Sequence, residues 1–286
     1  MNLPPKRIEI LQSLFRYPVQ RAGQLRDELL PSDKTGANTR AHLRPLVAAN
    51  LVRKYQPRIT DPLNNGSAPP VYTLTCEGGS VLAAITGDVK YLIKAEVSMS
   101  SWMNVNHWCS LSEMGKKFIS AFAGTDYLLS MHYEHEVVDL QASDPSKRYL
   151  LYTKISDKIV FVPDMLLKIC VKGHKRALFV EYETGSSAPQ RSAASKHKGV
   201  AGIAGGLFKK AFPEATDFRV VAFCPNAGWR DALRKEFKSK PGAEHWLFCA
   251  TPDVKKETFL HEPILYTVEK GPFPLIPRPT EPHLGR

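Results

Sequence analysis

Acidic side chains adjoin apolar segments at two places in the middle of the chain. Asp164 interrupts an apolar run at 159–167, and Glu181 and Glu183 follow a second run at 177–180. If these runs form neighbouring strands, the acids are drawn together at a partly buried sheet edge. Clustered carboxylates repel one another unless a cation joins them. The pattern therefore predicts a centre for a hard divalent cation such as Mg²⁺, which is the chemistry of a metal-dependent nuclease in an active or an inactive form.

The elements around these acids must bring them to one place. The segment Lys172-Gly173-His174-Lys175 predicts a turn, so the chain can return beside the first strand before it reaches Glu181. Glu183 lies two residues after Glu181, and side chains two residues apart on a strand point to the same face. We therefore expect Asp164, Glu181 and Glu183 to form one group.

Composition indicates a soluble globular protein that binds an acidic polymer. The chain has 286 residues, of which 43% are hydrophobic and 23% charged, enough for one large domain or two ordinary ones. Its net charge of +11 favours nucleic acid as the partner.

Cysteine usage and hydropathy point to the cytoplasm. The five cysteines are scattered, odd in number and mostly in apolar segments, as expected for reduced, buried thiols. The first residues lack the apolar core of a signal peptide, and no apolar run approaches membrane-spanning length. We expect a cytoplasmic protein with no membrane partner.

The N-terminal third predicts a winged helix-turn-helix domain at residues 1–95. Helical periodicity and capping signals indicate three helices, two strands follow with a Pro/Asn/Gly-rich loop between them, and a further helix closes the unit. The ranges are 8–15, 21–30 and 32–50 for the helices, 51–55 and 71–75 for the strands, and 77–85 for the closing helix. Element order and the phrases "LVAANLVRK" and "VYTLTCEGG" resemble the winged helix-turn-helix domains of bacterial DNA-binding proteins.

In this fold the third helix enters the major groove while basic residues of the wing hold phosphates. The side chains that we expect to be exposed for reading bases are Lys34, Thr35, Asn38, Thr39, Arg40, His42 and Arg44. Arg53, Lys54 and Arg58 are expected to contact the DNA backbone. The alternative is a winged helix with ordinary solvated residues that serves protein contacts.

The remainder predicts an α/β domain at 107–270, joined by a linker at 96–106 and followed by a proline-rich tail at 271–286 that is extended or disordered. Helices are expected at 107–122, 193–212 and 228–237. Strands are expected at 133–140, 149–154, 159–171, 177–183, 218–223 and 246–250.

This order of elements and acids resembles the PD-(D/E)XK restriction-endonuclease-like superfamily. With the winged helix in front, the whole chain resembles the replication-relaxation family of bacterial plasmids and mobile elements. The residues that carry the likeness are His107, Glu136, Pro163-Asp164-Met165-Leu166-Leu167 and Phe179-Val180-Glu181-Tyr182-Glu183-Thr184-Gly185. The implied fold is α/β, or α+β over the whole chain, in which the winged helix precedes a mixed sheet flanked by helices.

The resemblance implies roles for these residues. Asp164 and Glu181 would be ligands of Mg²⁺ or Mn²⁺, with Glu136 as a further ligand. The superfamily usually has a lysine at the position of Glu183, and this lysine helps to position or activate the attacking water. The acid at this position is therefore a departure from the superfamily pattern. Lys196 on the next helix is our first choice to replace that lysine, and Lys198 is the alternative.

The function expected from this resemblance is binding of double-stranded DNA in replication or mobilisation of a plasmid or mobile element. Relaxase or replication proteins are the expected protein partners. Two alternatives stay open. One is an active Mg²⁺-dependent endodeoxyribonuclease that uses Asp164, Glu181, Glu183 and Lys196, and the other is a non-catalytic transcriptional regulator.

Overall fold

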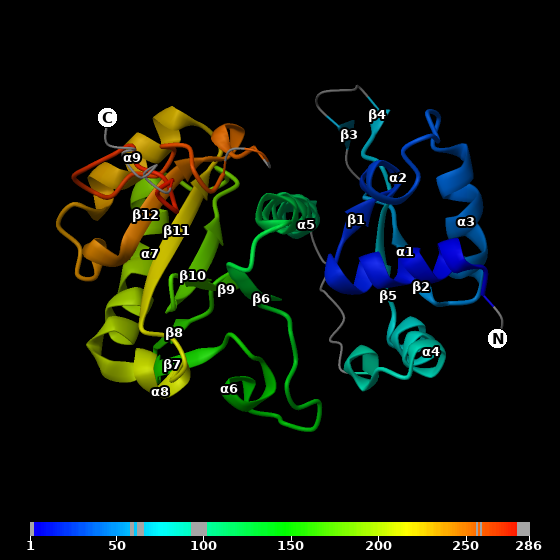
Figure 1. The fold of residues 1–286 in the computed structure, drawn as a ribbon, viewed down its shortest axis with the longest axis horizontal. Helices are drawn as coiled ribbons and strands as arrows, with labels where there is room; N and C mark the ends of the chain where they lie inside the picture. The colour runs from blue at the N-terminus through cyan, green and yellow to red at the C-terminus, as the bar shows by residue number, and fades with distance from the viewer. Residues whose placement is uncertain are drawn as a thin grey trace, which may run out of the picture. The chain divides into compact units, whose positions relative to one another are not determined.

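The structure, a computed structural model, describes residues 3–57, 60–61, 66–92, 102–255, 257 and 259–278. The chain divides into two compact units (Figure 1). Unit 1 comprises Met1–Lys116 and His135–Leu150, and unit 2 comprises Lys117–Glu134 and Leu151–Arg286. The domain boundaries expected from the sequence stay a prediction.

Unit 1 is a winged helix-turn-helix, as predicted. Its elements are α1 (Pro5–Arg16), β1 (Gln20–Arg21), α2 (Ala22–Leu29), α3 (Ala37–Ala48), β2 (Val52–Tyr55), β3 (Thr60–Asp61), β4 (Gly66–Ser67), β5 (Val71–Leu74), α4 (Cys76–Thr86) and the 3₁₀ turn η1 (Val89–Leu92). Strands β1, β5 and β2 form an antiparallel sheet, and β3 pairs with β4. Asn50, which follows the third helix, has a φ of 54°, in the left-handed region that is common after a helix end.

The apolar stripes of the helices in unit 1 meet in a single core. Ile10, Leu11 and Leu14 of α1 are fully buried against Leu43 and other apolar side chains from α3 and the sheet. The first part of α5 (Trp102–Phe122), up to Lys116, also belongs to this unit. It is bound to α2 by an ion pair of 2.8 Å between the Lys116 Nζ and Glu28.

Unit 2 contains a five-stranded mixed sheet flanked by helices, which confirms the predicted fold class. Its elements include β6 (Leu128–Tyr133), β7 (Thr153–Ser156), β8 (Ile159–Phe161), β9 (Met165–Val171), β10 (His174–Tyr182), α7 (Pro189–Gly202), the π-helical turn η2 (Ile203–Leu207), α8 (Phe208–Ala211), β11 (Asp217–Cys224), α9 (Ala227–Phe237), η3 (Ala243–His245), β12 (Trp246–Ala250) and η4 (Thr251–Asp253). The strand order is β12-β11-β10-β9-β6, with β10, β11 and β12 parallel and β9 and β6 antiparallel to their neighbours.

Two local features place the acids in this sheet. Pro163 cannot donate a hydrogen bond to a ladder, so the apolar run at 159–171 breaks into β8 and β9 with Asp164 immediately before β9. Strands β9 and β10 are then joined by a two-residue turn at Lys172 and Gly173, both with positive φ. The predicted turn and return strand are therefore confirmed.

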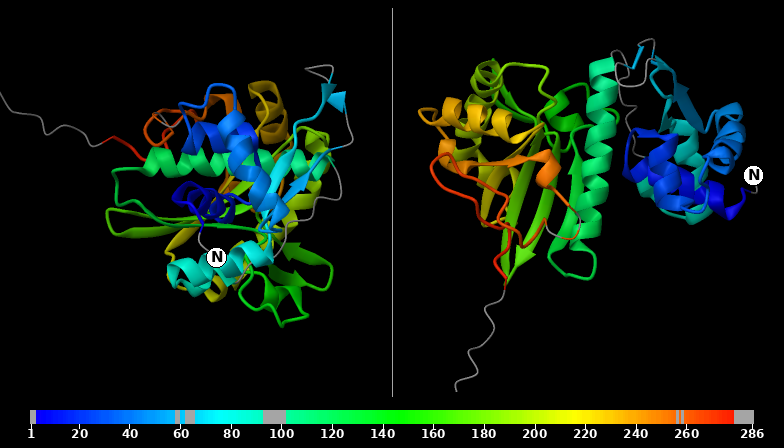
Figure 2. Two further views of the ribbon diagram at one scale, coloured as in Figure 1. Left: turned by 90° about the vertical axis from the view of Figure 1, so that its right-hand side faces the viewer. Right: turned by 90° about the horizontal axis from the view of Figure 1, so that it is seen from above.

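Helices and aromatic side chains cover both faces of the sheet. Helices α7 and α9 lie along one face (Figures 1 and 2), where Phe237 of α9 packs on Trp246 and Phe248. On the opposite face, Phe118 at the end of α5 packs on Phe223. Because both faces are covered, the strands of the sheet interior consist almost entirely of apolar residues.

Several predicted boundaries are wrong. The strand expected at 133–140 ends at Tyr133, because β6 runs from Leu128 and its ladder closes where the Glu134 N–H donates to the Asp164 carbonyl. Helix α5 begins at Trp102 instead of 107. The helix expected at 193–212 begins at Pro189 and is interrupted at η2, where Gly206 has a φ of 116°. The short helix α6 (Pro145–Arg148) in unit 1 was not predicted.

Within the part of the chain that the structure describes, no helix combines the length and apolar character needed to cross a lipid bilayer.

Close packing in unit 1 predicts opposite effects for two Gly→Ala changes. A Cβ at Gly78 in α4 would lie 2.2 Å from the Leu51 carbonyl oxygen, whereas a Cβ at Gly23 in α2 meets nothing within 4 Å. We expect Gly78→Ala to lower the free energy of unfolding by roughly 1–3 kcal/mol through overpacking. Gly23→Ala should raise it by about 0.4–1 kcal/mol because the unfolded chain loses freedom. Urea denaturation measures both, and equal effects of the two variants would contradict the packing described here.

Candidate functional site

Asp164 and Glu181 face each other across neighbouring strands. In the antiparallel register of β9 and β10, Met165 pairs with Val180, so the next opposed positions are Asp164 and Glu181. The carboxylate of Asp164 accepts a hydrogen bond of 2.6 Å from the Tyr182 N–H. This bond ties Asp164 to the end of β10 and fixes the acid beside its neighbour.

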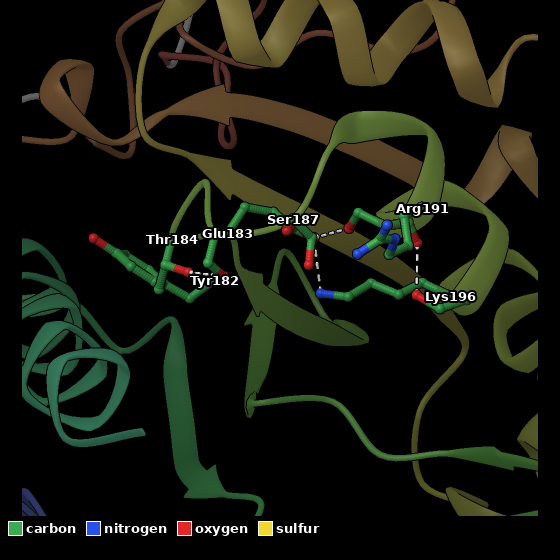
Figure 3. Close-up of a pocket in the computed structure, with 9 residues that line it drawn as sticks. Tyr182, Glu183, Thr184, Ser187, Arg191 and Lys196 are labelled. Atoms are coloured by element: carbon green, nitrogen blue, oxygen red, sulfur yellow. Dashed lines mark hydrogen bonds and ion pairs between the residues drawn. The ribbon is translucent and has the colours of Figure 1, made fainter. Parts of the chain in front are cut away.

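Lys196 of α7 joins two of the acids. Its Nζ lies 2.6 Å from an oxygen of Glu181. The same Nζ lies 2.8 Å from an oxygen of Glu183 (Figure 3). Ser192, one helical turn earlier, donates a hydrogen bond of 2.6 Å to the same oxygen of Glu183. Glu181 and Glu183 thus share one face, as predicted, and α7 supplies both of their partners. We call Asp164, Glu181, Glu183 and Lys196 the acid cluster.

Burial and crowding shape the charge of the acid cluster. Asp164, Glu181 and Glu183 are 9%, 6% and 7% exposed. Burial raises the pKa of Glu181 to about 8, and the nearby charges of Asp164 and Glu183 act in the same direction against Lys196. Burial disfavours the charged form of Lys196, but the attraction of the surrounding carboxylates is stronger. The pKa of Lys196 is therefore raised. The ammonium of Lys196 therefore stays charged, and Glu181 takes up a proton more readily than an ordinary glutamate.

The structure decides which lysine meets the acids. Lys196 makes both ion pairs, while Lys198 is exposed on the same helix. Glu136 follows the end of β6 and belongs to unit 1, whereas the acid cluster belongs to unit 2. Among the described residues, no three His, Cys, Asp or Glu side chains are arranged to hold a metal ion.

An open pocket of about 340 Å³ adjoins the acid cluster in unit 2 (Figure 3). It is lined by the end of β10, the following loop and the first two turns of α7, specifically Tyr182, Glu183, Thr184, Ser186, Ser187, Arg191, Ser192, Ser195 and Lys196. The pocket was not predicted from the sequence. Ser192 could have been noticed, since it lies four residues before Lys196 and hence on the same helical face.

The candidate nucleic-acid interface of unit 1 is the surface around α3. Lys34, Thr35, Asn38, Arg40 and Arg44 are exposed, and His42 is half-buried. On the wing, Arg53 and Lys54 of β2 are exposed, and Arg58 lies outside the described residues. Apart from Arg58, this surface offers the cations and amide that the sequence led us to expect.

Thr39 was predicted to be exposed, and this prediction is wrong. Its side chain is fully buried, and its hydroxyl donates a hydrogen bond of 2.8 Å to Asp33. The same Asp33 oxygen accepts the Thr39 N–H at 2.8 Å, and these bonds lower the pKa of Asp33. Thr39 therefore fixes the first turn of α3 to the preceding loop.

Comparison with known proteins gives one family and one solved structure. The family model described as replication-relaxation matches residues 11–211. A structure from Halomicrobium mukohataei, described as a protein with a GntR superfamily winged-helix-turn-helix domain, is 22% identical, covers 39% of this chain and 67% of that chain, and has a TM-score of 0.26. No curated protein matches the chain.

The raised pKa of Glu181 predicts a pH-dependent stability. Between its ordinary value of 4.5 and about 8, the folded protein holds a proton that the unfolded chain has released. The free energy of unfolding should therefore fall as pH rises through this window, by at most about 1.4 kcal/mol per pH unit from this group. Urea denaturation of wild type and Glu181→Gln at several pH values measures the effect.

Glu181→Gln should flatten the profile, since glutamine does not titrate. Glu262→Gln serves as the control, because Glu262 is more exposed and pairs with Arg278 far along the chain from the acid cluster. Parallel profiles for wild type and Glu181→Gln would contradict the assigned direction of the shift.

Proposed function

Since the chain belongs to the replication-relaxation family, we propose that it binds double-stranded DNA during replication or mobilisation of a plasmid or mobile element. The observation that carries this proposal is the surface of α3, where Asn38, Arg40 and Arg44 are exposed on the helix that a winged helix inserts into the major groove. Arginine can pair with guanine and asparagine with adenine, each through two hydrogen bonds. Arg53 and Lys54 of the wing would hold phosphates.

Charge and packing support the same proposal. The net charge of +11 favours a polyanion and predicts binding that weakens with salt. Thr39 donates two hydrogen bonds to Asp33, and these bonds hold the start of α3 in place. The outer side chains of α3 stay available for contacts with DNA. We propose a cytoplasmic protein with relaxase or replication proteins as partners.

A second candidate function is hydrolysis of DNA by a PD-(D/E)XK-type centre. The placement of Asp164 opposite Glu181 beside Lys196 favours it. Asp164 and Glu181 would hold Mg²⁺ or Mn²⁺, with Glu183 as a further ligand, and a bound ion would supply an activated water and a clamp on the phosphate. Lys196 would offset negative charge that develops on the phosphate.

Two members of the acid cluster are already engaged by other groups of the protein. One oxygen of Glu183 already accepts hydrogen bonds from Ser192 and Lys196, and one oxygen of Glu181 is paired with Lys196. The acids therefore already have a cationic partner within the protein. A transcriptional regulator would share the DNA-binding surface of α3 and differ only in its target sites.

Substitution of Arg44 tests the DNA-binding surface. Fluorescence anisotropy with labelled duplex DNA should show tight, salt-dependent binding by the wild type. Arg44→Ala should weaken binding roughly 5- to 150-fold, as expected for one lost base or phosphate contact of about 1–3 kcal/mol. Lys90→Ala is the matched control, because Lys90 is an exposed cation of unit 1 on η1. Absence of wild-type binding, or equal losses in both variants, would refute the proposal.

A plasmid assay separates binding from hydrolysis. Supercoiled plasmid is incubated with the wild type and with Asp164→Asn in Mg²⁺ or Mn²⁺, and nicking and binding are followed in parallel. We expect both proteins to bind DNA and neither to open the plasmid. Metal-dependent nicking by the wild type that Asp164→Asn abolishes would establish the second candidate function instead.

A further inference from the structure

The pocket beside the acid cluster presents polar groups suited to an anion. Four hydroxyl side chains besides Ser192 line it, namely Thr184, Ser186, Ser187 and Ser195. Arg191 and Lys196 add two cations from α7. A volume of about 340 Å³ accommodates a phosphate group with part of its sugar.

The acidic member of the lining is already compensated. Glu183 accepts hydrogen bonds from Lys196 at 2.8 Å and from Ser192 at 2.6 Å. Its negative charge is therefore balanced at short range by the ammonium of Lys196. An anion that enters the pocket therefore meets a Glu183 carboxylate that is already engaged by an ammonium and a hydroxyl and not an unopposed one.

Arg191 and Ser187 are two donors of the lining that are available to a ligand. Arg191 is exposed, and no ion pair or hydrogen bond of its guanidinium is seen within the described ranges. The Ser187 hydroxyl likewise has no hydrogen bond there, while Thr184 and Ser186 bond to each other at 2.9 Å. A guanidinium offers a planar pair of donors that matches two phosphate oxygens. Holding this charge at the mouth of a hydroxyl-lined pocket suits a phosphodiester.

The lining also indicates which part of a nucleic acid it would contact. The aromatic residue of the pocket is Tyr182, and Figure 3 shows its ring pointing away from Glu183 and Lys196. Without a ring to stack on a base, the pocket is suited to phosphate and sugar, which carry no sequence information. Such a contact positions DNA and does not select a sequence.

We propose that this pocket is a binding site for a backbone phosphate of the DNA, with Arg191 as its principal cation and Ser187 as a hydroxyl donor. The proposal rests on the proposed DNA-binding function and extends it to unit 2. The bound strand would pass next to the acid cluster, because Glu183 and Lys196 belong to both.

The salt dependence of DNA binding by the full chain tests this site. The affinity of wild type, Arg191→Ala and Lys158→Ala for a labelled duplex is measured at several salt concentrations. Each phosphate contact contributes about 0.9 to the slope of log affinity against log salt. Arg191→Ala should lose affinity at low salt and reduce the slope by about 0.9. Lys158→Ala removes an equal charge from an exposed turn of unit 2 outside the pocket lining and should leave the slope unchanged.

The outcomes are separable. If the wild type binds no duplex, the proposed function fails. If the wild type binds and Arg191→Ala keeps the wild-type slope, or Lys158→Ala reduces it equally, the pocket proposal alone is overturned. Ser187→Glu gives a second test, since a carboxylate in the pocket should also lower the slope. Inorganic phosphate that raises the melting temperature of the wild type but not of Arg191→Ala, with unchanged DNA slopes, would assign the pocket to a free anion and overturn the DNA assignment.

Discussion

The contact of Lys196 with Glu181 and Glu183 is the interaction on which the architecture of unit 2 depends. Three buried carboxylates at one sheet edge are unfavourable without a cation, because burial penalises charge and like charges repel. Helix α7 supplies the ammonium, and the pKa shifts of Glu181 and Lys196 express the balance between burial and attraction. Loss of one partner in such a buried pair commonly costs about 3–5 kcal/mol. The packing of α7 on the sheet and the charge of the acid cluster are therefore linked.

The same contact shapes the surface that we propose to bind DNA. With Glu183 held by Lys196 and Ser192, the neighbouring pocket presents Arg191 and hydroxyl groups to solvent. In unit 1, Asp33 similarly accepts the hydrogen bonds of a buried polar residue, Thr39, and the outer side chains of α3 stay exposed. In both units, buried polar groups satisfy one another and the exposed cations carry the proposed contacts with the polyanion.

The features that the sequence could predict are those with strong local causes. The turn around Gly173 was predicted, and it set the register of the return strand. The single strand expected at 159–171 was wrong, because Pro163 cannot donate a hydrogen bond to a ladder and the run breaks before Asp164. The choice of Lys196 followed from the resemblance to the PD-(D/E)XK superfamily, with Lys198 as the alternative, and the contacts with Glu181 and Glu183 are made by Lys196. These local rules were sufficient to group the acids correctly, although they said nothing of the hydrogen bond from the Tyr182 N–H to Asp164.

The features that were missed depend on tertiary packing. Thr39 belongs to a polar stretch, yet it is buried because Asp33 folds back to it across six residues. The strand β6 was misplaced because its pairing with β9 decides its ends, and local composition does not. Arg191 could be identified as a candidate binding residue only from the pocket that it lines. Side chains whose role depends on a cavity cannot be found by periodicity.

We propose that duplex DNA contacts unit 1 through α3 and unit 2 through the pocket beside Lys196. Hydrogen–deuterium exchange of the full chain, with and without duplex DNA, tests it most directly. Bound duplex should slow exchange in two separate segments, residues 34–48 and residues 184–196. Protection confined to one segment, or found only in other parts of the chain, would contradict it.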